Sequence, residues 1–311
     1  MVELSIREFL SIPHQPVTRH ITRHINGGNT TSRSREWDYT DARWLEPWDE
    51  FCPERLELEF GPLLDLRGPS ISHIEDVMDN YRDIHSEAQL VILQHMSIFT
   101  RVNRTWEACN NYLSQSQLLP DHLSKLSDRQ VISQGLQYGA TAPDQVFHLS
   151  ADGAQLHPNA VGESKLYAKW SYDRWKSSSI ADRVDFRQVV SQVNYYMRKR
   201  KCRYGIITNE LECIAVYRVP GYRGRLKVSR PFPIQTTDSL GHGDGKDMTA
   251  DVAIFCLPLW ARCEVSIDDD DVGEEDANLD EYFPEEPLSS SLPSSPPDFH
   301  HPTSEYLPSS E

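Results

Sequence analysis

Two carboxylates and one lysine stand at a spacing that suits metal-assisted chemistry. Asp144 opens a predicted strand, and Glu163 and Lys165 lie two positions apart on the next predicted strand. Residues i and i+2 of a strand point to the same face of a sheet. Glu163 and Lys165 would therefore lie side by side while Ser164 points away, and an antiparallel pairing would bring Asp144 next to them.

The chemistry that such a cluster could perform is hydrolysis of a phosphodiester bond. Carboxylate oxygens are ligands that Mg²⁺ and Mn²⁺ prefer. A bound cation lowers the pKa of its water and stabilises charge on a phosphate. A lysine can help to position that water and offset charge on the phosphorus. We therefore expect Asp144 and Glu163 to bind Mg²⁺ or Mn²⁺ and Lys165 to act in catalysis.

A carboxylate-x-Lys triplet by itself is a weak signal, because composition alone yields about one or two in a chain of this size. A second triplet, Asp244-Gly245-Lys246, lies in a Gly-rich loop with no acidic strand before it. This loop is not a phosphate-binding loop either, since Leu240 and Asp247 replace the Gly and the Ser/Thr that such a loop needs.

The context of Glu163 favours a site over an ordinary exposed pair of side chains on a strand, which is the alternative. Asp144 precedes Glu163 by 19 positions, and a predicted helix follows that carries Gln192 and Tyr196 one turn apart. These two side chains could support the site or the substrate. A helix face that merely touches the sheet is the alternative for them.

The hydrophobic pattern around these residues predicts one α/β unit over residues 131–218. Strands are expected at 131–138, 144–149, 161–168, 204–208 and 213–217, with the last two in a hairpin. Helices are expected from Ser70 or Ser72 to about residue 92, over 104–117 and over 184–200, and a helix or strand over 251–260.

These residues resemble the PD-(D/E)XK nuclease superfamily. Pro143-Asp144 resembles the PD element, Glu163-Ser164-Lys165 the (D/E)XK element, and Gln192–Tyr196 the Q-x-x-x-Y motif of the recombination-exonuclease branch. The segment is also similar to fungal members of the superfamily. The resemblance covers roughly residues 104–218. It implies a restriction-endonuclease-like α-β-β-β-α-β core, with a mixed sheet flanked by helices, Mg²⁺ dependence and DNA as substrate.

The resemblance also implies a glutamate on the helix before the first strand. Glu107 is the first choice for this additional metal ligand and Glu87 is the alternative. The runner-up function is a catalytically inactive nuclease-like module that binds nucleic acid or protein, because folds are often reused for other functions.

Composition divides the chain into three parts. Residues 1–60 are expected to form a flexible N-terminal arm whose aromatic residues, including Trp37 and Trp48, could dock on the body. Residues 70–262 would form the nuclease-like domain. Residues 265–311 contain 14 acidic residues and no Lys or Arg, so the formal net charge of -16 describes this tail more than the body.

The body contains a basic region that suits a nucleic-acid partner. Residues 165–230 contain 16 Lys or Arg against 5 Asp or Glu. Phosphates favour basic grooves and unstacked bases favour aromatic side chains. The run Arg198–Lys201 could be a nuclear signal or the last turn of a helix, where cations suit the helix dipole. The interleaved aromatic residues are Trp170, Trp175, Tyr195, Tyr204 and Tyr222.

The cysteine pattern and the apolar content predict an intracellular protein without membrane spans. The six cysteines form no C-x-x-C pair, which argues against a zinc knuckle and for reduced thiols. No stretch approaches the ~18 apolar residues of a membrane span, and the N-terminal residues lack a signal-peptide pattern.

The acidic, Ser/Pro-rich tail is expected to lack a packed core, because its few apolar residues cannot offset the entropy lost on ordering. Amide exchange of the full chain, followed by mass spectrometry, should be rapid across residues 268–311. Slow exchange across that stretch would contradict the expectation.

Overall fold

The computed structural model describes residues 4–14, 17–19, 37–67, 83–115, 129–135, 143–151, 157–222, 224–234 and 248–263. The predicted acidic tail and the Gly-rich loop around Asp244 lie outside these residues.

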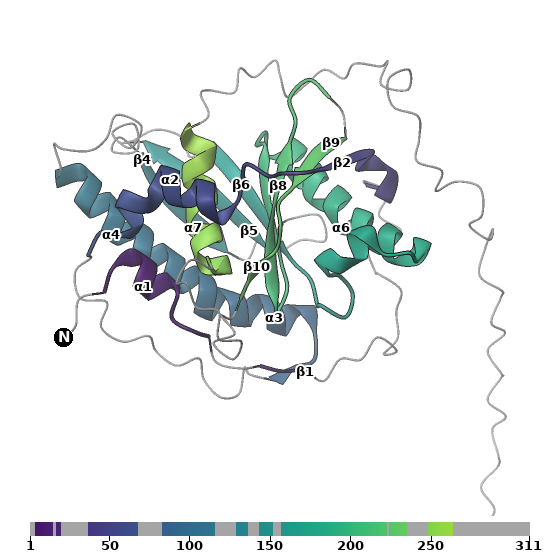
Figure 1. Cartoon of the computed structure of the whole chain (residues 1–311), viewed down its shortest axis with the longest axis horizontal. Coiled ribbons are helices and arrows are strands. Elements are labelled where there is room, and N and C mark those ends of the chain that lie inside the picture. Colours follow the sequence, from purple (N-terminus) through teal and green to yellow (C-terminus); the bar gives the residue numbers. More distant parts are fainter. Residues whose placement is uncertain are drawn as a thin grey trace, which may run out of the picture.

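A mixed, open β-sheet forms the centre of the described chain (Figure 1). Its strands are β2 (Trp44–Pro47), β4 (Arg129–Gly135), β5 (Gln145–Ala151), β6 (His157–Ser164), β7 (Tyr204–Thr208), β8 (Glu212–Arg218), β9 (Arg225–Val228) and β10 (Phe232–Pro233). They run in the order β2-β9-β8-β7-β6-β5-β4, and β10 pairs with β8 beside this path. The pairs β6–β7 and β2–β9 are parallel and the others are antiparallel. A separate parallel pair joins β1 (Thr18–Arg19) to β3 (Asp83–Ile84).

Helices cover both faces of this sheet, so the fold is α/β (Figure 1). One face carries α1 (Ile6–Leu10), α2 (Pro53–Leu64), α4 (Thr100–Gln115) and α7 (Ala250–Cys263). The other face carries α6 (Ile180–Lys199) and the 3-10 helices η2 (Tyr39–Asp41) and η5 (Tyr172–Lys176). Helix α3 (Glu87–Gln94) continues through one π-helical turn, η4 (His95–Phe99), directly into α4.

Alternation along β6 directs its side chains to the two helical layers. Ala160 belongs to the core that α4 and α7 cover, whereas Val161 packs in the core beneath α6. Gly205 on the neighbouring strand lets α6 approach the sheet, because a Cβ there would lie only 2.4 Å from a methyl group of Val193. Glu163 follows Val161 on the same face, so α6 lies over Glu163 as well.

The predicted strands and long helices of the α/β unit are confirmed, with small shifts at their ends. Strand β6 stops at Ser164 instead of residue 168, because the chain turns after Lys165 and the amides of Lys169 and Trp170 donate to the carbonyl of Leu166. Residues 251–260, expected as a helix or a strand, lie in a helix, α7, that spans Ala250–Cys263.

The prediction of a flexible arm is wrong for residues 4–14 and 37–60, since α1 buries Ile6, Phe9 and Leu10 in the core. Strand β2 pairs with β9, and the docked aromatics Trp37, Trp48 and Phe51 are buried. The predicted helix of residues 70–92 is wrong at residues 83–86, because Asp83 and Ile84 form β3 and Ser86 caps α3, and its residues 70–82 lie outside the described residues. Both errors have one cause: pairing between distant segments leaves no periodic signal in either segment.

A buried ion network ties the N-terminal segment to α4 and α7. Asp251, which is fully buried, accepts a hydrogen bond from Arg101 at 3.1 Å, and its other oxygen lies 2.9 Å from His14 Nε2. Arg101 also donates to the carbonyl of Ile12 at 2.6 Å. Three segments far apart in the sequence therefore share one carboxylate.

Asp251→Ala should lower the free energy of unfolding by about 3–5 kcal/mol, because it leaves the Arg101 guanidinium buried without its anionic partner. Urea titration followed by circular dichroism measures the change. The matched control is Glu57→Ala, which removes a half-exposed partner of Arg7 at 2.6 Å and should cost about 1 kcal/mol or less. Equal losses in the two variants would contradict a structural role for this network.

Candidate active site

The carboxylates of Asp144 and Glu163 meet where β5 begins and β6 ends. Gln145 pairs with Gly162 in antiparallel register, so the next pair outward sets Asp144 opposite Glu163. Directly opposed residues of an antiparallel pair point to the same face. A carboxylate oxygen of Asp144 also accepts the backbone N–H of Ser164 at 2.8 Å, which holds Asp144 against the end of β6.

Glu163 is a buried carboxylate whose two oxygens have different surroundings. Oε1 accepts from Lys165 Nζ at 2.6 Å and from Gln192 Nε2 at 2.7 Å. Oε2 is buried and has no hydrogen-bond partner among the residues that the structure describes. Glu163 and Lys165 are only 4 % and 5 % exposed. They therefore do not form an ordinary exposed pair of side chains on a strand.

Helix α6 supplies the two polar side chains that face the carboxylate. Gln192 bridges Glu163 and the hydroxyl of Tyr196, to which its Nε2 donates at 2.9 Å. The spacing of four residues brings Gln192 and Tyr196 together on one helix face. The amide oxygen of Gln192 is buried and, within the described stretches, has no hydrogen-bond partner.

Burial and neighbouring charges shift the pKa values of the three ionisable side chains in the cluster. Burial raises the pKa of Glu163 to about 8, although Lys165 acts in the opposite direction. Burial also raises the pKa of Asp144, against the hydrogen bond from the Ser164 amide. For Lys165, burial lowers the pKa, but the surrounding carboxylates of Glu163, Glu87 and Asp144 together raise it above its ordinary value. Lys165 therefore stays charged while Glu163 can exchange a proton near neutral pH.

Glu87, and not Glu107, lies near this cluster. The charge of Glu87 raises the pKa of Asp144 and Glu163, so it acts at short range on both carboxylates. Glu87 is half-buried and pairs with Lys169 at 3.5 Å. Glu107 is exposed and lies 20 residues further along the continuous helix. At 1.5 Å per residue this is about 30 Å along the helix axis. The first choice for the helix glutamate is thus replaced by the alternative.

The loop that follows Lys165 is held by side chains that the sequence did not single out. Glu210, in the turn between β7 and β8, accepts the backbone N–H of Tyr167 at 2.8 Å, and Glu212, the first residue of β8, accepts that of Tyr172 at 2.6 Å. Arg174 donates to the carbonyls of Ala168 and Lys169. The only sequence signal for such carboxylates is their place in a hairpin turn, which is shared by most turn residues.

The basic run at the end of α6 forms the last helical turn and the residues just after it. Arg198 and Lys199 end the helix, Arg200 caps it, and Lys201 adopts the left-handed backbone conformation with φ of 54°. The charge of Arg200 and burial lower the pKa of His148 on β5, with burial as the larger cause. Arg200 therefore lies close enough to His148, which pairs with Pro158 on β6, to act on its charge.

Two of the aromatic residues proposed for base stacking, Trp170 and Tyr204, are too deeply buried for it. Trp170 and Tyr204 are 0 % and 2 % exposed and belong to the cores. Tyr222 is 42 % exposed, with the Arg225 guanidinium 5.1 Å from its ring centre. Tyr195 is half-buried, with Lys199 Nζ at 5.5 Å from its ring centre.

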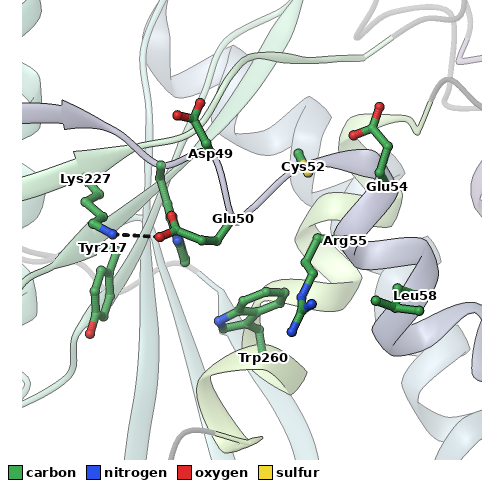
Figure 2. A pocket seen from close by; sticks show the side chains of 10 residues that line it. Asp49, Glu50, Cys52, Glu54, Arg55, Leu58, Tyr217, Lys227 and Trp260 are labelled. Atoms are coloured by element: carbon green, nitrogen blue, oxygen red, sulfur yellow. Dashed lines mark hydrogen bonds and ion pairs between the residues drawn. The ribbon is translucent and has the colours of Figure 1, made fainter.

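A separate pocket of about 620 Å³ lies on the other side of the sheet (Figure 2). Trp48, Tyr217 and Trp260 provide its aromatic walls, and Lys227 is engaged by Glu50 at 3.0 Å. The pocket is bounded by α2, α7 and β9, on the face opposite to α6. It contributes no side chain to the cluster around Glu163.

No three His, Cys, Asp or Glu side chains within the described residues are grouped closely enough to hold a metal ion together. The described cysteine side chains are free thiols. No described helix is long and apolar enough to cross a membrane. No protein-family model, curated protein or solved structure matches the chain.

The raised pKa of Glu163 should make stability depend on pH in a specific window. Between about 4.5, the ordinary value, and about 8, the folded chain holds one proton more than the unfolded chain. The free energy of unfolding should therefore fall as pH rises through this window, by up to about 1.4 kcal/mol per pH unit. The glutamine in Glu163→Gln cannot titrate. The free energy of unfolding of the wild type minus that of Glu163→Gln should therefore fall with rising pH when both are measured by urea titration.

Glu50 supplies a control of opposite sign. Burial raises the pKa of Glu50, but its hydrogen bond to Lys227 and the charge of Lys227 leave that pKa lowered. The free energy of unfolding of the wild type minus that of Glu50→Gln should rise with pH below about 4.5. A flat difference for Glu163→Gln between pH 5 and 8 would show that Glu163 is ionised throughout.

Proposed function

We propose that the chain is a metal-dependent nuclease that hydrolyses DNA phosphodiester bonds on a restriction-endonuclease-like core. The observation that carries the proposal is the state of Glu163. Its carboxylate is buried, its Oε1 is bound by Lys165 and Gln192, and its Oε2 has no partner among the described residues. Burying an unpartnered carboxylate oxygen is costly, and a ligand that binds this oxygen would remove the cost.

The donor atoms suit a hard divalent cation. Asp144 and Glu163 would hold Mg²⁺ or Mn²⁺ through oxygen, and Glu87 is close enough to add negative charge. When bound, the ion would supply an acidified water and stabilise charge on the phosphate. The fit is supported by the orphaned Oε2 and by the charge of Asp144, which adds to burial in raising the pKa of Glu163.

Lys165 would act on the substrate side of the same cluster. Its ammonium is charged, buried and held 2.6 Å from Glu163, so it would neutralise charge that develops on the phosphate or orient the attacking water. Gln192 and Tyr196 would keep the carboxylate and the ammonium in place. The Arg198–Lys201 run and Arg203 lie at the end of the helix that covers the site and would contact the DNA backbone.

A catalytically inactive nuclease-like module that binds nucleic acid is the second candidate. The ion pair between Lys165 and Glu163 favours it, because the ammonium already neutralises the carboxylate. The pairing of Glu87 with Lys169 at 3.5 Å adds to this argument, since it engages the third carboxylate.

Three substitutions should separate chemistry, metal binding and substrate binding. Lys165→Met retains the buried stem and should reduce cleavage at least about 100-fold while leaving Mn²⁺ affinity nearly unchanged. Asp144→Asn retains an acceptor for the Ser164 amide but should weaken Mn²⁺ binding and therefore cleavage. Arg200→Ala should weaken DNA binding and lower its salt slope by about one. Nuclease assays with Mg²⁺ or Mn²⁺ on single- and double-stranded DNA, calorimetry and DNA binding at several salt concentrations measure these effects.

Arg55→Ala is the matched control for Arg200→Ala. It removes the same charge from α2, on the face opposite to α6, where Arg55 pairs with Glu59 at 2.6 Å. Its DNA affinity should stay at the wild-type value. If the wild-type chain binds DNA and cuts none of it with either metal, the inactive binding module replaces the nuclease.

A further inference from the structure

The structure assigns a positioning role to Gln94, which lies on the face of the sheet opposite to Glu163. We propose that Gln94 sets the placement of Asp144 and Glu87 relative to Glu163 by clamping the ends of β6 and β7 to α3. The inference rests on the proposed metal-dependent function and concerns the same site. Gln94 touches neither carboxylate and acts through the backbone and the helix.

The clamp consists of three hydrogen bonds from one buried side chain. Gln94 is 2 % exposed. Its Oε1 accepts from Ser164 Oγ at 2.7 Å and from Thr208 Oγ1 at 2.9 Å, and its Nε2 donates to the carbonyl of Asn209 at 3.0 Å. Both atoms of the amide are thus used, and both strand ends are held by a single group.

Ser164 connects this clamp to the carboxylates. It lies between Glu163 and Lys165, so its own side chain points to the opposite face, where Gln94 holds it. Its backbone N–H donates to Asp144 at 2.8 Å. The neighbouring amide, that of Lys165, donates to the carbonyl of Thr208 at 2.8 Å. A shift of Ser164 would therefore move Asp144 relative to Glu163.

The same side chain anchors the helix that carries Glu87. Glu87, Leu90 and Gln94 lie at positions i, i+3 and i+7, which share one face of a helix. Leu90 is buried in a small core with Leu166, directly after the site lysine. The π-helical turn begins at the next residue, His95. An extra residue in that turn lets α3 face the strand ends while α4 faces Phe147 and α7.

A polar residue at position 94 is needed because of what it faces. Leucine would fill similar space but would leave two hydroxyls and one carbonyl buried without this partner. The hydroxyls of Ser164 and Thr208, 3.3 Å apart, could still bond to each other, but the carbonyl of Asn209 would need water, and the strand ends would move away from α3 to admit it. The effect should appear in the geometry of the metal ligands and not only in overall stability.

The test compares Gln94→Leu with Thr105→Val in the full chain. Thr105 is equally buried, lies further along the same continuous helix, and its hydroxyl donates within that helix to the carbonyl of Arg101 at 3.0 Å. Gln94→Leu should weaken Mn²⁺ binding by about 10- to 100-fold, the range for groups that orient metal ligands. Thr105→Val should leave Mn²⁺ affinity unchanged. Calorimetry with Mn²⁺ alone provides the affinities.

A second measurement needs no metal. Amide exchange at Ser164, read by nuclear magnetic resonance, should accelerate in Gln94→Leu more than tenfold relative to the core amide of Ile207, and should be unchanged in Thr105→Val. Ser164→Ala should weaken Mn²⁺ binding as well, and the double variant with Gln94→Leu should lose no more than the sum of the two single losses.

The two readouts distinguish failure of this inference from failure of the proposed function. If the wild-type chain binds no Mn²⁺, the metal-dependent function falls and exchange at Ser164 alone decides the role of Gln94. If Mn²⁺ binds and Gln94→Leu binds it like wild type, or if exchange at Ser164 is unchanged, Gln94 is a structural core residue and the inference is overturned.

Discussion

The burial of the Glu163 carboxylate is the constraint on which the rest of this structure depends. Removing an ionised group from water costs several kcal/mol unless charges and hydrogen bonds replace the water. Here one oxygen receives an ammonium and an amide, and the other receives no partner from the described residues. The pKa rises to about 8 as a result. In this environment the Glu163 carboxylate would be stabilised by binding either a proton or a cation.

The parallel pairing of β6 with β7 makes this placement possible. Two parallel neighbours end at the same edge of a sheet, so the ends of both strands and the start of β5 meet at one place. The connection between β6 and β7 has to cross the sheet face, and α6 is that connection. The helix that joins the strands therefore also delivers Gln192 and Tyr196 to the carboxylate. The crossover helix α6 thus determines both the parallel pairing of β6 with β7 and the side chains that face Glu163.

The sequence predicted the local parts of this arrangement. Alternation in β6 placed Glu163 and Lys165 on one face, and a four-residue spacing placed Gln192 and Tyr196 on one side of α6, because both patterns follow from backbone geometry. The choice between Glu107 and Glu87 could not be made in the same way. It depends on which part of one long helix lies beside the ends of β6 and β7, and that is decided by contacts such as those of Gln94 with Ser164 and Thr208, which are distant in sequence.

The N-terminal residues were misjudged for a related reason. Strand β2 is four residues long and meets its partner β9 about 180 positions later, so its hydrogen bonds leave no trace in local composition. Buried polar side chains that hold distant segments together likewise have no recognisable pattern in the sequence. Gln94 lies in an α-helix, Glu210 in a turn and Arg174 in a short 3-10 helix, and only the folded chain gives them their partners.

The long separation between paired segments also bears on the order of events during protein synthesis. The amide of Lys165 bonds to the carbonyl of Thr208, 43 residues further on, and β2 bonds to residues still later in the chain. When Lys165 leaves the ribosome, the strand that completes its edge of the sheet has not yet been made. Asp144 and Glu163 therefore remain hydrated in the growing chain, and the cost of burying them arises only when α6 docks and β7 is inserted. A partly synthesised chain carries Asp144, Glu163 and Lys165 and still lacks the buried carboxylate.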